Sequence, residues 1–272
     1  MNDYLSGAGA EKPELESDYQ NWIESNEEIA AILDIGELLL KSGAEVMRVE
    51  DTISRLALAY GFVRADVFTI TSSIVLTVSL KSGRVMTQTR RVKERSTNLG
   101  MIEKLNDLSR RACSSEMSVR ELRAATSALA AENEPHTVLF LICYAVISAA
   151  FSVFFGGNGR DAAAALLSGT VLFLTLQCMD RLKVNLLIEN VICSAATAFS
   201  VMLLVRAGLG VNPDKIMIGN IMLLIPGIQL TTSLRDIFNG DMIAGVLGLI
   251  DACVKALAIA CGFAAVLITM GG

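Results

Sequence analysis

The chain has 272 residues, of which 53% are hydrophobic and 19% charged, and its formal net charge is −5. Ordinary globular proteins carry about 25% charged residues, so this composition argues against an entirely soluble chain. It also argues against a disordered chain and against a nucleic-acid-binding protein, which would carry a basic excess. Six cysteines without a Cys-x-x-Cys pair argue against a secreted disulfide scaffold.

The charged residues are unevenly distributed along the chain. Residues 1–135 hold 16 basic and 21 acidic side chains, whereas residues 136–272 hold seven of each, mostly between long apolar runs. The first part is therefore expected to face water and the second part to lie in a membrane. The fold class predicted is an α-helical membrane protein with about five transmembrane helices and an N-terminal soluble α+β domain.

The N-terminal part divides into a tail and a domain. Residues 1–26 contain six acidic residues, one lysine and no apolar core of a signal peptide, so they predict an acidic flexible tail. Residues 27–134 are expected to form the α+β domain, because helical periodicity gives way to a period of two and then returns. The helices expected are 27–41, 44–60, 98–114 and 118–131, and the strands are 67–70, 74–80 and 85–92.

Charged side chains gather at the start of the second predicted helix, at Glu45, Arg48, Glu50 and Asp51. Two interpretations stay open for this cluster. One is a solvated helix face, in which the charges pair locally at spacings of three and four residues. The other is a contact with a partner protein or with the cytoplasmic mouth of a pore.

Five apolar segments follow within the expected membrane domain, residues 135–272. The first is uncharged for 19 residues, about 28 Å at 1.5 Å per residue, close to the roughly 30 Å hydrocarbon core of a bilayer. Repeated spans of this length predict a helical bundle in lipid, where each helix pairs its own backbone groups. The spans lie at about 137–155, 162–179, 187–205, 216–234 and 242–270.

Arginines decide the expected orientation, because basic residues flank the cytoplasmic side of membrane spans. Arg110, Arg111, Arg120 and Arg123 precede the first span. We therefore expect a multi-pass protein of the cytoplasmic (inner) membrane, in contact with lipid, with its N-terminal domain in the cytoplasm.

The last span contains two charges, Asp251 and Lys255, four residues apart and so on one helix face. A lone charge at mid-membrane costs about 2.5–3.5 kcal/mol on insertion scales. The pair is interpreted either as an inert contact with a neighbouring helix or as a proton or substrate relay in a wet cavity. Glu189, in the first turn of the third span, and Asp241, before the last span, are further gating or coupling candidates.

A Pro-Gly pair interrupts the fourth span and polar side chains follow it. Proline lacks an N–H and clashes with the preceding turn, so the helix is expected to break there. Transporters build substrate sites at such breaks, whereas a kink absorbed by packing is the alternative. The predicted substrate-binding residues are Pro226, Gly227, Gln229, Thr231, Thr232 and Arg235. Asp236 is expected to gate the cytoplasmic end together with Arg235.

These motifs carry a resemblance to a known family. The segment Leu39–Glu50, the strand end Thr89–Val92, Asn98-Leu99, Pro226-Gly227 and the later Arg235–Gly245 segment occur in this order. Together they resemble the threonine/serine exporter family over about residues 28–270, nearly the whole chain. The first half of the chain is similar to the N-terminal half of that family.

The resemblance implies a function and a partner. Members of this family are either fused chains of about ten spans or split pairs, and a chain of five spans resembles the split form. It implies a secondary exporter of small polar metabolites such as threonine and serine, proton-coupled and paired with a smaller multi-span membrane protein, with a homo-oligomer also open. Some split members are linked to dicarboxylate export, which is the first alternative substrate class.

A second alternative is a membrane-anchored enzyme or a regulatory subunit that uses the N-terminal domain. Residues 28–134 contain no histidine and no nucleophile motif, so we expect no enzyme activity and no catalytic residue. We likewise expect no metal, since His136 is the single histidine of the chain. We also expect no cofactor and no nucleic-acid partner.

Overall fold

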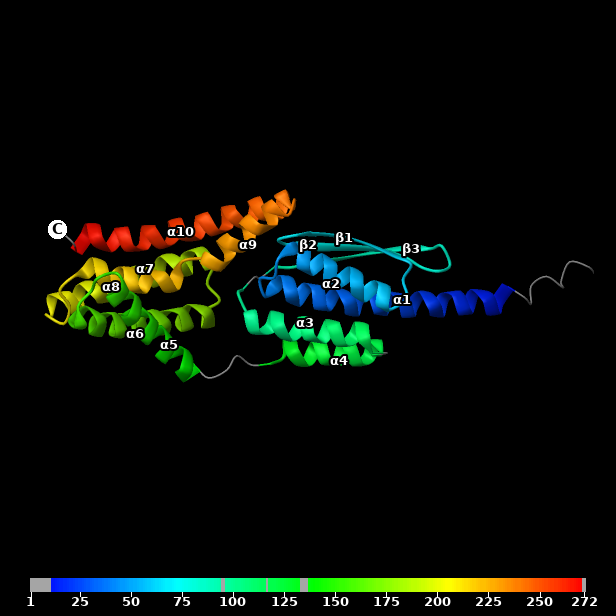
Figure 1. Cartoon of the computed structure of the whole chain (residues 1–272), viewed down its shortest axis with the longest axis horizontal. Coiled ribbons are helices and arrows are strands. Elements are labelled where there is room, and N and C mark those ends of the chain that lie inside the picture. The colour runs from blue at the N-terminus through cyan, green and yellow to red at the C-terminus, as the bar shows by residue number, and fades with distance from the viewer. Residues whose placement is uncertain (1–10, 94–95, 116, 133–136, 271–272) are drawn as a thin grey trace, which may run out of the picture. The chain divides into compact units, whose positions relative to one another are not determined.

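The computed structural model describes residues 11–93, 96–115, 117–132 and 137–270. The chain divides into two compact units (Figure 1). The first comprises Met1–Glu132 together with Thr231–Gly248, and the second comprises Asn133–Leu230 together with Leu249–Gly272. Residues 231–248, which the sequence analysis assigns to the membrane domain, therefore cluster with the N-terminal α+β part.

Over its described residues, the first unit contains four complete helices and a three-stranded sheet, stacked in layers. Its elements are α1 (Glu11–Lys41), α2 (Val46–Ala59), β1 (Arg64–Ile70), β2 (Ser73–Ser79), β3 (Val85–Arg91), α3 (Leu99–Ser114) and α4 (Val119–Ala130). Helices α1 and α2 lie between the sheet on one side and α3 and α4 on the other (Figure 1). Its buried core includes Ile32, Leu39, Ile53 and Leu76, contributed by α1, α2 and β2.

Helix α1 begins at Glu11, well before the start expected at residue 27. The prediction of a flexible tail therefore differs from the structure over residues 11–26, and residues 1–10 lie outside the described part. Glu is a good helix former, so the composition that suggested a solvated tail is also compatible with a helix.

The turn between α1 and α2 requires a glycine. Gly43 has a φ of +86°, and the N–H of Ala44 donates to the Leu39 carbonyl at 3.0 Å in the pattern of a Schellman C-cap. A Cβ on Gly43 would lie 2.8 Å from the Ser96 carbonyl oxygen. The helix end expected at this position from the sequence is confirmed, and it sets where α2 begins.

The sheet is antiparallel with the order β1-β2-β3. Alternate side chains of the central strand, Ile74, Leu76 and Val78, are fully buried, as expected for one face packed on helices. Gly83, at a φ of +81°, forms the β2–β3 turn expected there, and Leu80 N–H donates to the Arg84 carbonyl at 2.9 Å. The three predicted strands are thus confirmed, with no end shifted by more than three residues.

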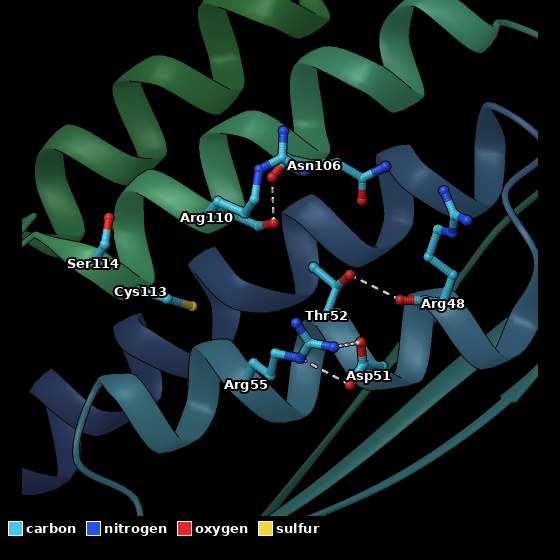
Figure 2. A pocket seen from close by; sticks show the side chains of 9 residues that line it. Arg48, Asp51, Thr52, Arg55, Asn106, Arg110, Cys113 and Ser114 are labelled. Atoms are coloured by element: carbon cyan, nitrogen blue, oxygen red, sulfur yellow. Dashed lines mark hydrogen bonds and ion pairs between the residues drawn. The ribbon is translucent and has the colours of Figure 1, made fainter.

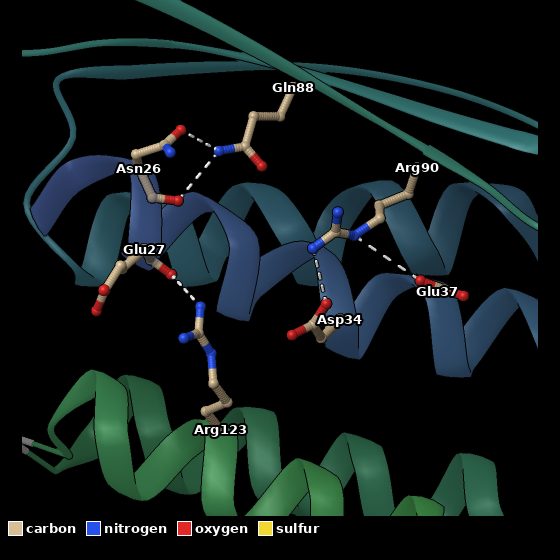
Figure 3. A network of polar contacts seen from close by, with 7 residues as sticks. All are labelled: Asn26, Glu27, Asp34, Glu37, Gln88, Arg90 and Arg123. Carbon is tan, nitrogen blue, oxygen red and sulfur yellow. Dashed lines mark hydrogen bonds and ion pairs between the residues drawn. The ribbon is translucent and has the colours of Figure 1, made fainter. Parts of the chain in front are cut away.

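Polar contacts join β3 to α1 (Figure 3). Arg90 lies 3.0 Å from an Asp34 carboxylate oxygen and 3.8 Å from one of Glu37. Gln88 donates to the carbonyl of Asn26 at 3.0 Å and to its side-chain oxygen at 2.5 Å. These contacts set how β3 lies across α1, because each needs a specific register of the strand.

The second unit is a bundle of apolar helices. It contains α5 (Thr137–Phe154), α6 (Gly159–Arg181), α7 (Leu186–Arg206), α8 (Pro213–Leu224), the first turn of α9 (Gly227–Phe238) and most of α10 (Met242–Met270). Within the described residues, α5, α6, α7 and α10 are each long and apolar enough to cross a membrane. Helices α8 and α9 pass the same test together, as a pair bent by 51° at a short break. If this pair is counted as one span, the described residues have five candidate spans.

Small residues allow these helices to approach closely. A Cβ on Gly169 would lie 2.8 Å from the Ser148 Cβ, and one on Gly262 would lie 2.5 Å from the Val191 carbonyl oxygen. Small residues are enriched at helix contacts in membranes for this reason. Many large apolar side chains of α5 and α10 remain exposed, among them Val138, Ile142, Leu257 and Ile268.

Candidate functional site

Three polar side chains meet at the break between α8 and α9. The Lys255 ammonium lies 2.9 Å from an Asp251 carboxylate oxygen. Gln229 bridges the two, accepting a hydrogen bond from Lys255 at 2.7 Å and donating one to Asp251 at 2.5 Å. We call Gln229, Asp251 and Lys255 the triad.

The break itself positions Gln229. Helix α8 ends at Leu224 and α9 begins at Gly227, so Pro226 lies in the interruption that the sequence predicted. Pro226 has no N–H to donate, but its carbonyl accepts from the Leu230 N–H at 2.9 Å and starts the first turn of α9. Gln229 lies in that turn, where its side chain reaches α10.

The triad joins charges that differ in exposure. The Lys255 side chain is 15% exposed, whereas that of Asp251 is 53% exposed. Both lie in a span whose neighbours are apolar, so each charge depends on its partners for stabilisation. An acid, a base and an amide in mutual contact can exchange hydrogen-bond partners when one of them changes protonation or binds an anion.

The structure separates the predicted site residues into two groups. Gln229, Asp251 and Lys255 lie in the second unit, whereas Thr231, Thr232, Arg235, Asp236 and Asp241 lie in the first. Glu189 lies half-buried in the first turn of α7, and its predicted coupling role stays a prediction.

The second group meets the start of α2. Arg235 donates to the Glu45 carboxylate at 2.6 Å. The side chain of Asp236 accepts from the Val46 N–H at 3.2 Å in a buried hydrogen bond. The first N–H groups of a helix have no partner within the helix and attract anions, so Asp236 acts as a cap for α2 from a distant part of the chain.

Helix α10 stays close to α9 in this region because of its glycines. A Cβ on Gly245 would lie 2.7 Å from the Ser233 carbonyl oxygen, and one on Gly248 would clash with the Ser233 hydroxyl. Asp241 immediately precedes α10, at the tip of the α9–α10 hairpin. The hairpin therefore presents Asp236 and Asp241 together to the start of α2.

Glu50 lies next to this acidic tip. Its carboxylate accepts from the Thr69 N–H at 2.7 Å. Burial is the main cause that raises the pKa of Glu50 above its ordinary value of 4.5, and the nearby charges of Asp241 and Asp236 raise it further, while the hydrogen bonds from Thr69 oppose the shift. Glu50 is thus a proton-binding group at the contact between α2 and the α9–α10 hairpin.

The raised pKa of Glu50 predicts a pH dependence of stability. A group that binds its proton more tightly in the folded state stabilises the fold fully below the unfolded pKa, about 4.5, and loses that contribution as pH rises through the folded value. The measurement is the melting temperature in detergent solution, for the wild type and for Glu50→Gln. We expect the value for the wild type minus the value for the variant to fall as pH rises through this window. Parallel melting curves across the window would contradict the prediction.

The Glu45–Arg235 pair predicts a charge-swap result. Arg235→Glu places a second carboxylate against Glu45 and beside Asp236, and is expected to lower the free energy of unfolding by roughly 1 kcal/mol, the cost of disturbing a partly exposed pair. Glu45→Arg combined with Arg235→Glu restores opposite charges and is expected to recover most of this loss. The measurement is the melting temperature in detergent solution. A double variant no better than the single one would show that the pair has no role.

Sequence reasoning missed two buried polar residues of the second unit. Asp161 is fully buried and accepts from the backbone N–H groups of Val211 and Asn212 at 2.7 and 2.9 Å. Asn220 accepts from the Ser148 hydroxyl at 3.0 Å and donates to that of Ser168 at 2.8 Å. The Asn-x-x-Asp pattern before α6, a capping box in the structure, was a signal that could have revealed Asp161.

Comparison with known proteins gives a family and two relatives. A protein-family model described as "Putative threonine/serine exporter" matches residues 30–270. A protein of Klebsiella aerogenes named "Probable succinate transporter subunit YjjP" is 25% identical over 209 residues, which is 76% of this chain and 80% of the relative. A protein of the same name from Escherichia coli strain K12 is 24% identical over 215 residues, 79% and 83% of the two chains. No solved structure matches the chain.

Proposed function

Because this chain belongs to the threonine/serine exporter family, we propose that it is one subunit of a proton-coupled secondary exporter of small carboxylate-bearing metabolites in the cytoplasmic membrane. The observation that carries the proposal is the triad, a cation paired with an acid and an amide on apolar helices at a helix break. Broken helices of this kind form substrate sites in secondary transporters.

A carboxylate is the chemical group that the triad suits. Lys255 offers an ammonium with three donors, and Gln229 offers an amide that can donate or accept. Threonine, serine and dicarboxylates such as succinate all carry a carboxylate. The two relatives are named as succinate transporter subunits, which favours a dicarboxylate, whereas the family description favours threonine or serine.

Coupling to protons follows from competition for Lys255. While Asp251 is ionised, its carboxylate neutralises Lys255 and occupies one of its donors. A substrate carboxylate that pairs with Lys255 must compete with Asp251, so the charge state of Asp251 and substrate binding depend on each other. Substrate binding is therefore expected to depend on pH.

Two supports favour a two-component assembly. The relatives are named as subunits, and the described residues provide four or five spans, an arrangement suited to pairing with a second membrane protein in inverted topology. We propose a smaller multi-span membrane protein as the partner. The arginines of α3 and α4, Arg110, Arg111, Arg120 and Arg123, favour a cytoplasmic location for the first unit.

The test is a transport assay in inverted membrane vesicles that contain this chain alone, the partner alone or both. Labelled serine, threonine and succinate are compared, with and without a proton gradient. We expect uptake to require both subunits and to respond to the gradient. A preference for succinate would agree with the names of the two relatives. Equal uptake by the partner alone would reduce this chain to a regulatory subunit, and no uptake of any of the three would overturn the proposal.

A further inference from the structure

A polar hollow lies between α2 and α3 in the first unit (Figure 2), and its lining includes none of the triad or α9–α10 hairpin residues described above. Its volume is about 650 Å³, within the range of small-molecule sites. The residues that matter are Arg48, Asp51 and Arg55 on α2 and Asn106, Arg110 and Cys113 on α3. We call this site the α2–α3 hollow.

The charges that line the hollow are mainly basic. The lining contains three arginines, Arg48, Arg55 and Arg110, and one acidic residue, Asp51. Arg48 and Arg55 are seven residues apart on α2, two helical turns along one face, which separates their Cα atoms by about 10 Å. Arg110 adds a third guanidinium from the facing helix. A lining with an excess of two positive charges fits a ligand with two negative charges.

The partners of the arginines show which of them can bind a ligand. Arg55 is held by both oxygens of Asp51, which fixes its orientation on the helix. Arg110 lies 3.6 Å from Asp107, a carboxylate that also pairs with Arg111. Arg48 makes no ion pair with any residue that the structure describes, so its five donors remain available.

The hydroxyl groups at the wall favour binding over catalysis. Thr52 donates its hydroxyl proton to the Arg48 carbonyl at 2.8 Å, and Ser109 donates to the Asn106 carbonyl at 2.9 Å. Both protons are used within the helices. The donors left for a ligand are the guanidinium groups and the Asn106 amide, and guanidinium groups bind carboxylates and phosphates in a two-pronged geometry.

We propose that the α2–α3 hollow binds a small dianion, either a dicarboxylate or a phosphate-bearing metabolite, at a site separate from the transport triad. Only the use of succinate as a probe rests on the proposed function, because the site itself follows from the arginines. Arg48 lies on α2 two residues beyond Val46, whose N–H is capped by Asp236. A ligand here would therefore act on the helix that holds the α9–α10 hairpin.

Cys113 provides a direct measure of occupancy, because its thiol lies in the wall of the hollow. The other cysteines are Cys143, Cys178, Cys193, Cys253 and Cys261. In the full chain, with these five replaced by alanine, Cys113 is alkylated by a maleimide and followed by mass spectrometry. Burial raises the pKa of the Cys113 thiol above its ordinary value of 9.0, while Arg55 opposes the shift, so mildly alkaline buffer is used to provide thiolate.

Millimolar succinate and inorganic phosphate are tested at matched ionic strength, with serine as a zwitterionic control. We expect one or both dianions to slow alkylation, serine to have no effect, and Arg48→Gln with Arg110→Gln to raise the protecting concentration about tenfold or more. Protection by succinate indicates a site for a dicarboxylate, and protection by phosphate alone indicates one for a phosphate-bearing ligand.

Two control variants test whether a change in protection reflects altered folding or the loss of transport. Arg111→Gln removes a guanidinium from the same helix outside the hollow and should leave protection unchanged. Lys255→Gln tests the triad, and protection should persist even where transport is lost. Protection by neither dianion, or equal protection in the Arg48→Gln, Arg110→Gln variant, would overturn the proposal.

Discussion

Asp251→Asn is expected to abolish proton-driven transport while the protein still inserts and folds. The amide keeps the shape of the side chain and can still contact Gln229 and Lys255, but it cannot carry a proton. Removing one charged partner from such a site costs on the order of 3 kcal/mol, which corresponds to about two orders of magnitude in rate. The measurement is gradient-driven uptake in vesicles that contain equal amounts of wild type and variant.

Binding measurements then separate the roles of the triad residues. In Asp251→Asn, Lys255 has lost its ionised partner, so substrate binding should remain and become independent of pH. In Lys255→Gln, binding itself should be lost, because the cation is gone. Thr269→Ala, at the far end of the same helix, where the hydroxyl bonds only to carbonyls of its own helix, is the matched control. Normal gradient-driven transport by Asp251→Asn would remove its coupling role.

Asp161→Ala is expected to cause a clear loss of stability in the second unit. Its carboxylate accepts from four donors, namely the backbone N–H groups of Asn158, Val211 and Asn212 and the Asn212 side-chain amide. It thereby links the start of α6 to the start of α8. Removing this fully buried side chain leaves part-buried donors without their acceptor, at a cost of about 1–3 kcal/mol.

The loss can be measured by the exposure of Cys193, which is fully buried in α7. In a variant that keeps only this cysteine, a thiol-reactive dye reports thermal unfolding in detergent. Asp180→Ala removes the same charge from the exposed C-terminal end of α6 and should change stability by less than about 0.5 kcal/mol. Equal melting temperatures for Asp161→Ala and Asp180→Ala would refute the structural role of Asp161.

Local patterns were sufficient to predict most elements. The predicted helix end at residue 41 and helix start at residue 118 are confirmed, and the structure has Gly43 and the Ser118–Glu121 capping box there. Both motifs depend on residues close together in the chain. The spacing of Asp251 and Lys255 likewise predicted their pairing, which is also confirmed. These features follow from helical geometry alone.

The contacts between distant segments could not be predicted in the same way. The bond from Val46 N–H to Asp236 joins residues 190 positions apart, and no periodicity specifies which helix N-terminus an acid will cap. Nor did the pattern show that residues 231–248 would cluster with the N-terminal part. The residues expected to form one substrate site are for this reason assigned to different units, Gln229 to one and Arg235 to the other.

The sharing of α9 and α10 by both units has a practical consequence for anyone who wishes to cut this chain. A fragment that ends near residue 132 would keep α2 but lose the hairpin whose Asp236 satisfies the first turn of that helix. The N-terminal backbone amides of α2 would then be solvated instead of capped. Genetic fusion or truncation should preserve residues 231–248 in place, since the boundary of an autonomously folding piece does not coincide with the boundary of the hydrophobic sequence.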